Sequence, residues 1–232
     1  MKHERIAFCV LLAFFLLAPG VMYPVFLMKV MCFALFASAF NLLLGFGGLL
    51  SFGHAMFLGT AGYVAAHSAK VWGLPPELAI LLGTGASLAL GVVTGLLAIR
   101  RQGIYFAMIT LALSQMVFFF CLQAPFTHGE DGLQGVPRGT LFGLLSLDDD
   151  TTMYYVVLAI FVACFLGILR IVTSPFGQVL KMIRENEPRT TSLGYDVDKY
   201  KLLAFVLSAS IAGLAGSLKT LVMGFASLTD VT

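Results

Sequence analysis

Side chains that could do covalent or metal chemistry are few and widely spread along this chain. The sequence has no HExxH pair, no phosphate-cradling GxxxxGK(S/T) loop and no Ser/His/Asp set within its apolar runs. Its four cysteines fall in different apolar runs and form no CxxC pair, so neither disulfides nor a metal site are predicted: Cys9, Cys32, Cys121 and Cys164. We therefore expect no catalytic residue, no metal and no cofactor, and a protein that is not an enzyme.

The polar residues with the most informative setting lie in a glycine-rich stretch, "NLLLGFGGLLSFGHAMFLGTAG", from Asn41 to Gly62. Glycine this dense weakens a helix. Two interpretations stay open: a broken helix that lines a water-filled cavity, as at many transporter sites, or a tight cytoplasmic turn from Gly45 to Ser51. The first makes six residues candidates for a substrate pathway: Asn41, Gly45, Gly47, Gly48, Ser51 and His54. A lone histidine such as His54 is, however, more often hydrogen-bonded structure than a ligand.

The elements that must position these residues are membrane helices. With 59% hydrophobic and 11% charged residues and a mean hydropathy of +0.95, the 232-residue chain is too apolar for a soluble protein. A spanning helix needs roughly 20 apolar residues, and seven runs qualify: 6–23, 25–44, 51–69, 77–99, 104–122, 153–172 and 202–223. We expect an all-α polytopic membrane protein with about seven transmembrane helices. The net charge of +2 gives no reason to expect a nucleic-acid partner.

The distribution of Lys and Arg between short loops predicts the orientation of the chain. The N-terminus carries Lys2 and Arg5, the link before the fifth run carries Arg100 and Arg101, and six cations lie between positions 170 and 201. The loop 123–152 has a net charge of −4 and falls on the opposite face. We therefore expect a cytoplasmic N-terminus and an external acidic loop. The first run is expected to remain as an uncleaved helix rather than a signal peptide, because Glu4 interrupts its basic region.

Two of the runs carry small residues at helical spacing. Gly83, Ser87, Gly91 and Gly95 recur every four residues in the fourth run, and the seventh run is rich in Gly, Ala and Ser from 208 to 217. Small residues let helix backbones approach closely within a membrane. We expect both helices to pack against other helices, with no direct part in function.

The most polar part of the chain is the segment 173–201, "TSPFGQVLKMIRENEPRTTSLGYDVDKYK". Ser174 before Pro175 predicts a helix start, with the hydroxyl capping a free N–H group and the proline in the first turn. Pro188 should end that helix, because the residue before a proline is biased away from helix. Further along, we expect a second break and then a helix cap at these positions: Gly194, and Asp196 or Asp198.

One face of the helix that begins after Ser174 is apolar, and it carries Phe176, Val179, Leu180 and Ile183. Such a helix either rests on lipid headgroups or docks in a groove of a soluble partner, with Phe176 displayed toward that partner. Ion-coupled carriers usually hold charged residues within the membrane. We favour docking because we expect no such residues in the interiors of the fourth to seventh runs. The energy for uphill transport would then come from the partner.

Three stretches of the chain resemble the membrane permeases of branched-chain amino acid ABC transporters, the LivM type of the LivH/LivM family. They are "NLLLGFGGLLSFGHAMFLG", "GEDGLQGVP" at Gly129 to Pro137, and "SPFGQVLKMIRENEPRTTSLGYDVDKYKLLAFVLSASIAGLAGSL" at Ser174 to Leu218. The resemblance covers nearly the whole chain. It implies a single permease domain over 1–232, part of a type II-like ABC importer permease fold, that lacks the C-terminal helices of the family. The chain is then either a truncated product or part of a longer sequence.

The resemblance also implies partners. These are two cytoplasmic ATP-binding subunits, a second permease subunit, a periplasmic or extracellular solute-binding protein and membrane lipid, in a bacterial inner membrane. The segment 173–201 would be the coupling segment that docks on the ATP-binding subunits, through Ser174, Pro175, Phe176, Gly177, Leu180, Arg184, Glu185, Asn186, Gly194 and Tyr200. Arg189 and Thr190 stand where the family usually has a pair of small residues. Leucine, isoleucine and valine are the default substrates, and the alternative function is an ATP-independent channel or facilitator for a small polar solute such as urea.

Overall fold

The computed structural model of the chain describes residues 15–16, 18–20, 22–101, 103–141, 143 and 145–231. Most of the first predicted run, together with Lys2, Arg5 and Cys9, lies outside the described residues. The expectations of an uncleaved first helix and a cytoplasmic N-terminus therefore stay predictions.

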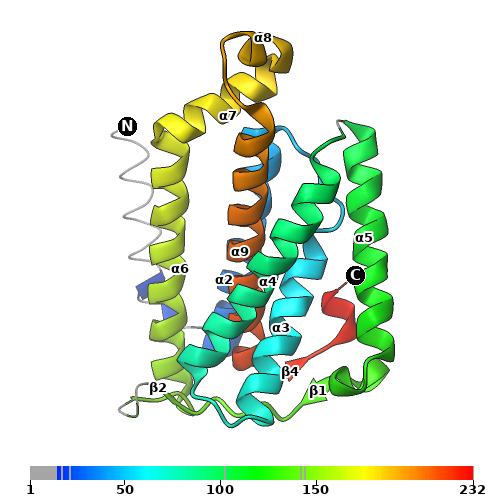
Figure 1. Ribbon diagram of the computed structural model, residues 1–232. Helices are drawn as coiled ribbons and strands as arrows, with labels where there is room; N and C mark the ends of the chain where they lie inside the picture. The colour runs from blue at the N-terminus through cyan, green and yellow to red at the C-terminus, as the bar shows by residue number, and fades with distance from the viewer. Residues whose placement is uncertain are drawn as a thin grey trace.

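Six long helices run side by side through the described part of the chain (Figure 1). They are α2 (Pro24–Asn41), α3 (His54–Lys70), α4 (Pro76–Ala98), α5 (Ile104–Gln123), α6 (Asp150–Thr173) and α9 (Val197–Met223). Each coincides with one of the predicted apolar runs after the first, to within a few residues. All but α3, which has 17 residues, belong to the five spans that are long and apolar enough to cross a membrane. The predicted all-α membrane architecture is confirmed.

The remaining elements are short. The helical ones are η1 (Ala18–Gly20), the π-helix η2 (Leu42–Phe46), η3 (Pro125–Thr127), η4 (Gly129–Asp131), α7 (Pro175–Glu185), α8 (Glu187–Ser192) and η5 (Leu228–Asp230). The strands are β1 (Leu133–Gln134), β2 (Thr140–Leu141), β3 (Leu145–Ser146) and β4 (Phe225–Ala226). Antiparallel pairing joins β1 to β4, with Leu133 opposite Ala226, and β2 to β3, with Thr140 opposite Ser146.

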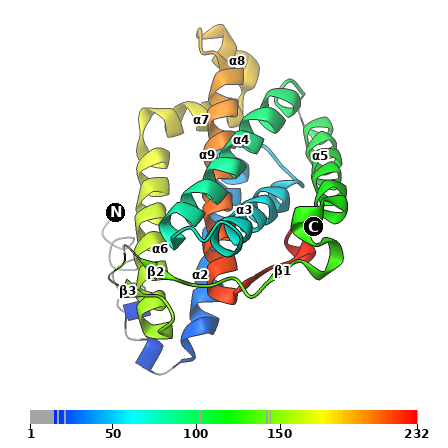
Figure 2. The same ribbon diagram turned by 60° about the horizontal axis from the view of Figure 1, so that its bottom comes forward.

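Helix α9 lies in the middle of the bundle, packed against α2, α3 and α4, with α6 and α5 at opposite edges (Figure 2). Small residues make these close contacts possible. A Cβ atom added to Gly91 of α4 would lie 2.7 Å from Cβ of Ala209 on α9. The Ser87 hydroxyl donates a 2.7 Å hydrogen bond to the Ala209 carbonyl oxygen. The prediction that the small residues of the fourth and seventh runs face other helices is confirmed.

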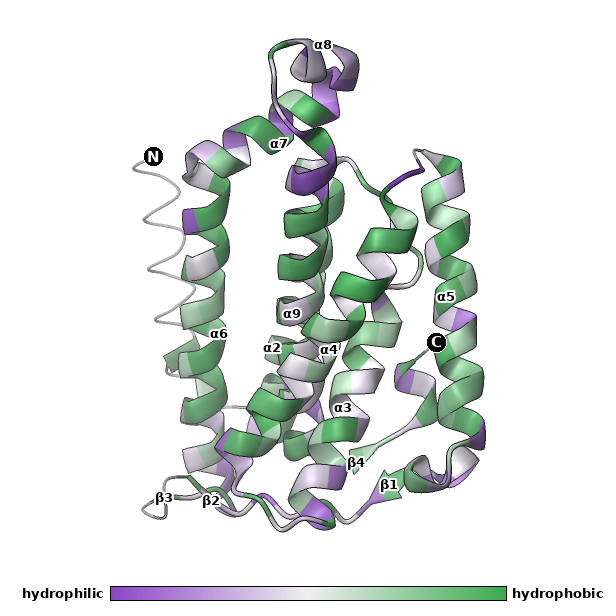
Figure 3. Cartoon of the chain, in the orientation of Figure 1, coloured by the Kyte–Doolittle hydropathy of each residue, from purple (hydrophilic) through white to green (hydrophobic). Residues whose placement is uncertain are grey.

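The two ends of the bundle differ in charge, as the loop composition predicts. The α4–α5 link, with Arg100 and Arg101, lies at the same end as α7 and α8, whereas the loop between α5 and α6 lies at the other end (Figure 1). Hydrophobic residues cover the helices between these two ends (Figure 3). Within the acidic loop, Arg138 pairs with Asp150 at 2.6 Å and donates to the Val222 carbonyl oxygen at 3.1 Å, which ties the loop to α9.

Candidate functional site

The polar segment 173–201 forms two short helices that cross one end of the bundle. The hydroxyl of Ser174 accepts a 3.5 Å hydrogen bond from the Gly177 backbone N–H, and Pro175 occupies the first turn of α7, as predicted. Gly177 is required here, because a Cβ atom would collide with the backbone of Val172 at the end of α6. The close packing of this turn therefore sets the angle at which α7 leaves α6.

Helix α7 ends earlier than the sequence predicts. It stops at Glu185, and Asn186 adopts an extended conformation with φ −156°. The Asn186 side-chain oxygen accepts a 3.0 Å hydrogen bond from the Arg189 backbone N–H, so Asn186 caps α8. Pro188 lies in the first turn of α8, where a proline needs no hydrogen-bond partner for its nitrogen. The prediction that Pro188 ends the helix is therefore wrong, and Asn186 is the terminating residue.

The apolar face of α7 packs against the chain's own helices. Val179, Leu180 and Ile183 are buried, and the Phe176 ring stacks on Tyr200 of α9 with a centroid distance of 5.6 Å and an interplanar angle of 21°. Phe176 is therefore half-buried against the chain's own helix α9, and its display toward a partner stays a prediction. Helix α7 lies across the ends of α6, α9 and η2, which cover its apolar side.

Beyond α8 the chain turns back toward the bundle. Gly194 has φ +91°, a conformation that favours glycine, so the predicted break is confirmed. The Asp196 carboxylate caps α9 by accepting a 3.4 Å hydrogen bond from the Lys199 backbone N–H. Its hydrogen bond with the Lys199 side chain lowers the pKa of Asp196. Leu193, at the tip beside Gly194, is 60% exposed.

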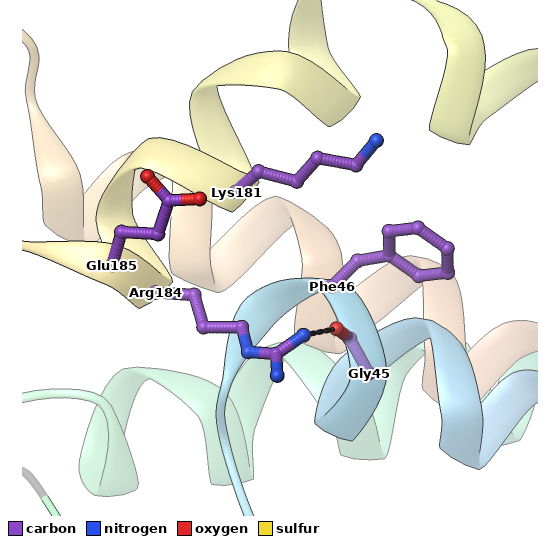
Figure 4. A pocket seen from close by; sticks show the side chains of 5 residues that line it. All are labelled: Gly45, Phe46, Lys181, Arg184 and Glu185. Atoms are coloured by element: carbon purple, nitrogen blue, oxygen red, sulfur yellow. Dashed lines mark hydrogen bonds between the residues drawn. The ribbon is translucent and has the colours of Figure 1, made fainter.

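Helix α7 also contacts the glycine-rich junction, where α2 continues into the π-helix η2. The Arg184 guanidinium donates a hydrogen bond to the Gly45 carbonyl oxygen, and Nζ of Lys181 lies 5.6 Å from the centroid of the Phe46 ring (Figure 4). Gly48 has φ +68°, and a Cβ atom there would lie 2.9 Å from Cγ of Arg184. The structure therefore brings together two candidate sites that the sequence analysis treats separately.

A cavity of about 580 Å³ lies between these two segments. Its lining includes Asn41, Gly45, Gly47, Gly48, Arg184, Glu187 and Lys201. Nζ of Lys201 lies 2.6 Å from the Glu187 carboxylate, and the Lys201 side chain is only 3% exposed. Sequence reasoning missed this ion pair, because nothing in the 14-residue separation of the two residues signals that they meet.

Two of the six pathway candidates lie away from this cavity. His54 is buried, and its Nε2 atom lies 2.7 Å from the Ser208 hydroxyl, which in turn donates to the Ala39 carbonyl oxygen. This chain of hydrogen bonds joins α3, α9 and α2, so His54 has a structural part. Ser51 is also buried, and its hydroxyl has no hydrogen-bond partner among the described residues.

The glycine-rich junction follows a complete span. Helix α2 and η2 together form a 23-residue span, Pro24–Phe46, and the non-helical residues 48–53 come soon after it, at the same end as α7. Gly53 then packs against the backbone of Thr110 in α5. This arrangement favours a turn between two helices over a helix broken in mid-membrane.

A charged residue of the seventh predicted run lies inside the bundle. Lys219 belongs to the seventh predicted run and is buried in α9, where it pairs with Asp230. The treatment of that run as free of charge is therefore wrong. Among the described residues, no three His, Cys, Asp or Glu side chains lie close enough together to hold a metal ion.

Comparison with known proteins gives consistent matches. Residues 23–232 match the model of a family described as the branched-chain amino acid transport system permease component. The high-affinity branched-chain amino acid transport system permease protein LivM of Salmonella typhimurium is 29% identical over 87% of this chain and 53% of its own length, and LivM of Escherichia coli K12 is 28% identical over the same shares. A probable LivM permease of Methanocaldococcus jannaschii is 26% identical over 62% of this chain and 41% of its own. The chain thus spans about half the length of the curated relatives it matches first, and no solved structure matches it.

Proposed function

The chain belongs to the branched-chain amino acid transport permease family, and we propose that it is the membrane-spanning subunit of an ATP-driven importer for branched-chain amino acids. It is a multi-pass membrane protein with α7 and α8 at one end and the acidic loop at the other. In this proposal ATP-binding subunits dock at the α7–α8 end, which faces the cytoplasm. A solute-binding protein delivers substrate at the acidic end, and a second permease subunit completes the complex in the bacterial inner membrane.

The observation that carries the proposal is the way α7 and α8 project beyond the bundle (Figure 1). Val179, Leu180 and Ile183 of α7 are buried, and α7 contacts α6, α9 and η2. The exposed polar residues of α7 are Gln178, Lys181, Arg184 and Glu185. A polar, charged surface held rigidly at the end of a membrane bundle suits a soluble partner better than lipid tails. A motion imposed on this surface would also reach the membrane helices directly.

The predicted coupling residues divide into two groups in this scheme. Those that build the segment set its caps, its turn and its apolar contacts: Ser174, Pro175, Phe176, Gly177, Leu180 and Tyr200. Those exposed at its surface could meet a partner: Glu185, Asn186 and Gly194, whereas Arg184, although exposed, bonds to Gly45. Leu193 joins the second group, because it is the large apolar side chain most exposed in the segment. We propose it in place of Phe176 as the apolar anchor.

The proposed transmission runs from α7 to the glycine-rich junction. Because Arg184 bonds to Gly45 and its stem packs on Gly48, a displacement of α7 would move the end of α2 and the link to α3. Asn41, Gly45, Gly47 and Gly48 line the cavity beside this contact and would form the cytoplasmic end of the substrate pathway. Ser51 and His54 would belong to the packing around it.

Copurification of the ATP-binding subunit with the permease tests the proposal. Burying a leucine side chain in a partner stabilises a complex by about 1.5–3 kcal/mol, so Leu193→Ala should weaken association roughly 10-fold or more. Leu145→Ala is the matched control, because Leu145 is 51% exposed in β3 at the opposite end. Equal recovery with both variants would argue against docking through the α8 tip. Uptake that persists without any ATP-binding subunit would support the facilitator instead.

A further inference from the structure

The chain re-enters the bundle after α9. Gly224, with φ +73°, ends the helix, β4 pairs with β1, and η5 then packs against α3 and α5 (Figures 1 and 2). Asp230 and Val231 lie against Gly59 of α3, where a Cβ atom would collide with both. Because α3 runs from His54 to Lys70, residues 225–231 reach well inside the bundle. Non-helical backbone at this depth occurs where it is buried in protein or lines a cavity, and it often marks a transported substrate's site.

This re-entrant segment brings a carboxylate to a buried lysine. Lys219 and Asp230 form an ion pair whose side chains are only 8% and 13% exposed. Nζ of Lys219 lies 5.8 Å from the centroid of the Phe33 ring and 5.9 Å from that of Phe225. A charge at membrane depth is costly and is typically retained for a function. Here two opposite charges lie together beside two aromatic rings.

The pair lies level with the middle of α3. A Cβ atom on Gly62, the ninth of the 17 residues of α3, would lie 2.7 Å from the hydroxyl oxygen of Thr220, the neighbour of Lys219. Tyr63 of α3 lies one helical turn after Gly59, the residue that packs against the backbone of Asp230. Its side chain is buried, and its hydroxyl has no hydrogen-bond partner among the described residues. An unpaired buried hydroxyl costs free energy unless a ligand or water satisfies it.

From these observations we infer that Lys219, Asp230 and Tyr63 form a binding site for a zwitterionic amino acid, an inference that rests on the proposed transport function. The α-carboxylate of the substrate takes the place of Asp230 at the Lys219 ammonium, and the α-ammonium of the substrate pairs with the released Asp230 carboxylate. The Tyr63 hydroxyl donates to the substrate carboxylate. The rings of Phe33 and Phe225 receive the apolar side chain.

The exchange of partners explains why a zwitterion is required. A ligand with both charges replaces the internal ion pair without leaving any buried charge unpaired, and an unpaired buried charge is strongly unfavourable. A neutral amide such as urea compensates neither Lys219 nor Asp230. A ligand with one charge leaves the other partner alone. The site therefore selects amino acids over the small neutral solutes of the alternative function.

Thermal unfolding of the purified chain in lipid nanodiscs tests the site without any partner protein. A bound ligand raises the unfolding temperature, so saturating leucine should raise it by several degrees. Leucinamide, which lacks the carboxylate, 4-methylpentanoate, which lacks the ammonium, and urea should each leave it unchanged. A shift of equal size with leucinamide, or no shift with leucine, would overturn the inference.

Variants separate the binding site from a purely structural ion pair. Replacing a buried pair by apolar residues of similar size often preserves the fold, so Lys219→Met with Asp230→Leu should fold but lose the leucine-dependent shift. The control variant Lys199→Met removes the exposed lysine of the Lys199–Asp196 pair on the same helix, and it should keep the shift. If the double variant keeps the shift, the pair is only structural. The ATP-binding subunit should copurify equally with all variants. If it copurifies with none of them, including the unmodified chain, that result would count against the proposed function and not against the binding site.

Discussion

Arg184 and Gly48 are the residues through which the polar segment holds the glycine-rich junction. The guanidinium bonds to a carbonyl oxygen of the π-helix, and the aliphatic stem occupies the space beside a glycine with positive φ. π-Helical turns are uncommon and frequently occur at functional sites. The contact is therefore the place where a single substitution should separate docking from transport.

Gly48 and Gly47 offer a matched test of the junction, because they are neighbours and only Gly48 has a backbone conformation and surroundings that require glycine. Gly48 has φ +68° and faces Arg184, whereas Gly47 has φ −86° and open space within 4 Å of the position that a Cβ atom would take. Left-handed backbone costs a non-glycine residue roughly 1–2 kcal/mol. We expect Gly48→Ala to lower the free energy of unfolding by about that amount and Gly47→Ala to change it little. Equal unfolding temperatures would show that the turn relaxes at no cost.

Arg184→Ala should uncouple transport from docking. The ATP-binding subunit should still copurify, whereas leucine uptake by the assembled transporter should fall roughly 3- to 10-fold, because an exposed charge-assisted hydrogen bond contributes about 1 kcal/mol. Arg101→Ala removes the same charge from the same end of the bundle and should leave uptake unchanged. Loss of copurification with Arg184→Ala would instead make Arg184 a docking residue.

At the scale of elements, α7 and α8 are two helices because Asn186 caps the second one. The cap lets the chain turn sharply after Glu185, and the turn carries α8 away from the membrane helices, to the tip seen in Figure 1. The apolar face of α7, by contrast, anchors the pair to the bundle. A rigid anchor with a small projecting helix is the arrangement expected of an element that transmits motion.

Removal of this cap should loosen α8 selectively. Replacing an asparagine N-cap by alanine costs about 0.5–2 kcal/mol, so Asn186→Ala should speed hydrogen exchange of the amides from 189 to 193, while those of α9 keep their protection. Asp149→Ala, which removes the cap of α6 at the opposite end, is the control and should leave α8 unchanged. Faster exchange throughout α9 would mean that α8 and α9 unfold as one unit.

At the scale of the whole molecule, the bundle has one basic and one acidic end, and two polar sites lie at different depths. The cavity beside Arg184 lies at the α7–α8 end, whereas the Lys219–Asp230 pair lies near the middle of α3. Under the proposed function, a substrate would reach the buried pair from the acidic end and leave past the glycine-rich junction. This order depends on the orientation of the chain in the membrane.

Single-cysteine labelling measures that orientation. Gln178 in α7 and Gln134 in β1 are both exposed and lie at opposite ends. In a background without native cysteines, Gln178→Cys should react only with a membrane-permeant thiol reagent, and Gln134→Cys should also react with an impermeant one. The reverse pattern would place α7 and α8 outside the cell and would contradict docking of ATP-binding subunits there.

Features that depend on neighbouring residues could be predicted from the sequence. Apolar runs of sufficient length predicted the long helices, and Ser174 and either Asp196 or Asp198 were predicted as helix caps, because a span or a cap is decided within a few residues of chain. The distribution of charge between the loops predicted the contrast between the two ends for the same reason. The prediction that Pro188 ends the first short helix was wrong because Asn186 ends that helix and caps the next one.

Contacts between distant residues could not be predicted from the sequence. Arg184 and Gly45 are 139 positions apart, and no local pattern indicates that they bond. Phe176 has the spacing of an apolar face, but whether that face meets a partner or the chain's own helices depends on where α7 lies against α6 and α9. Lys219 and Asp230 are 11 positions apart, yet they meet only because the chain reverses at Gly224 and re-enters between α3 and α5. Such contacts follow from the packing of whole helices, which the order of residues along one segment does not specify.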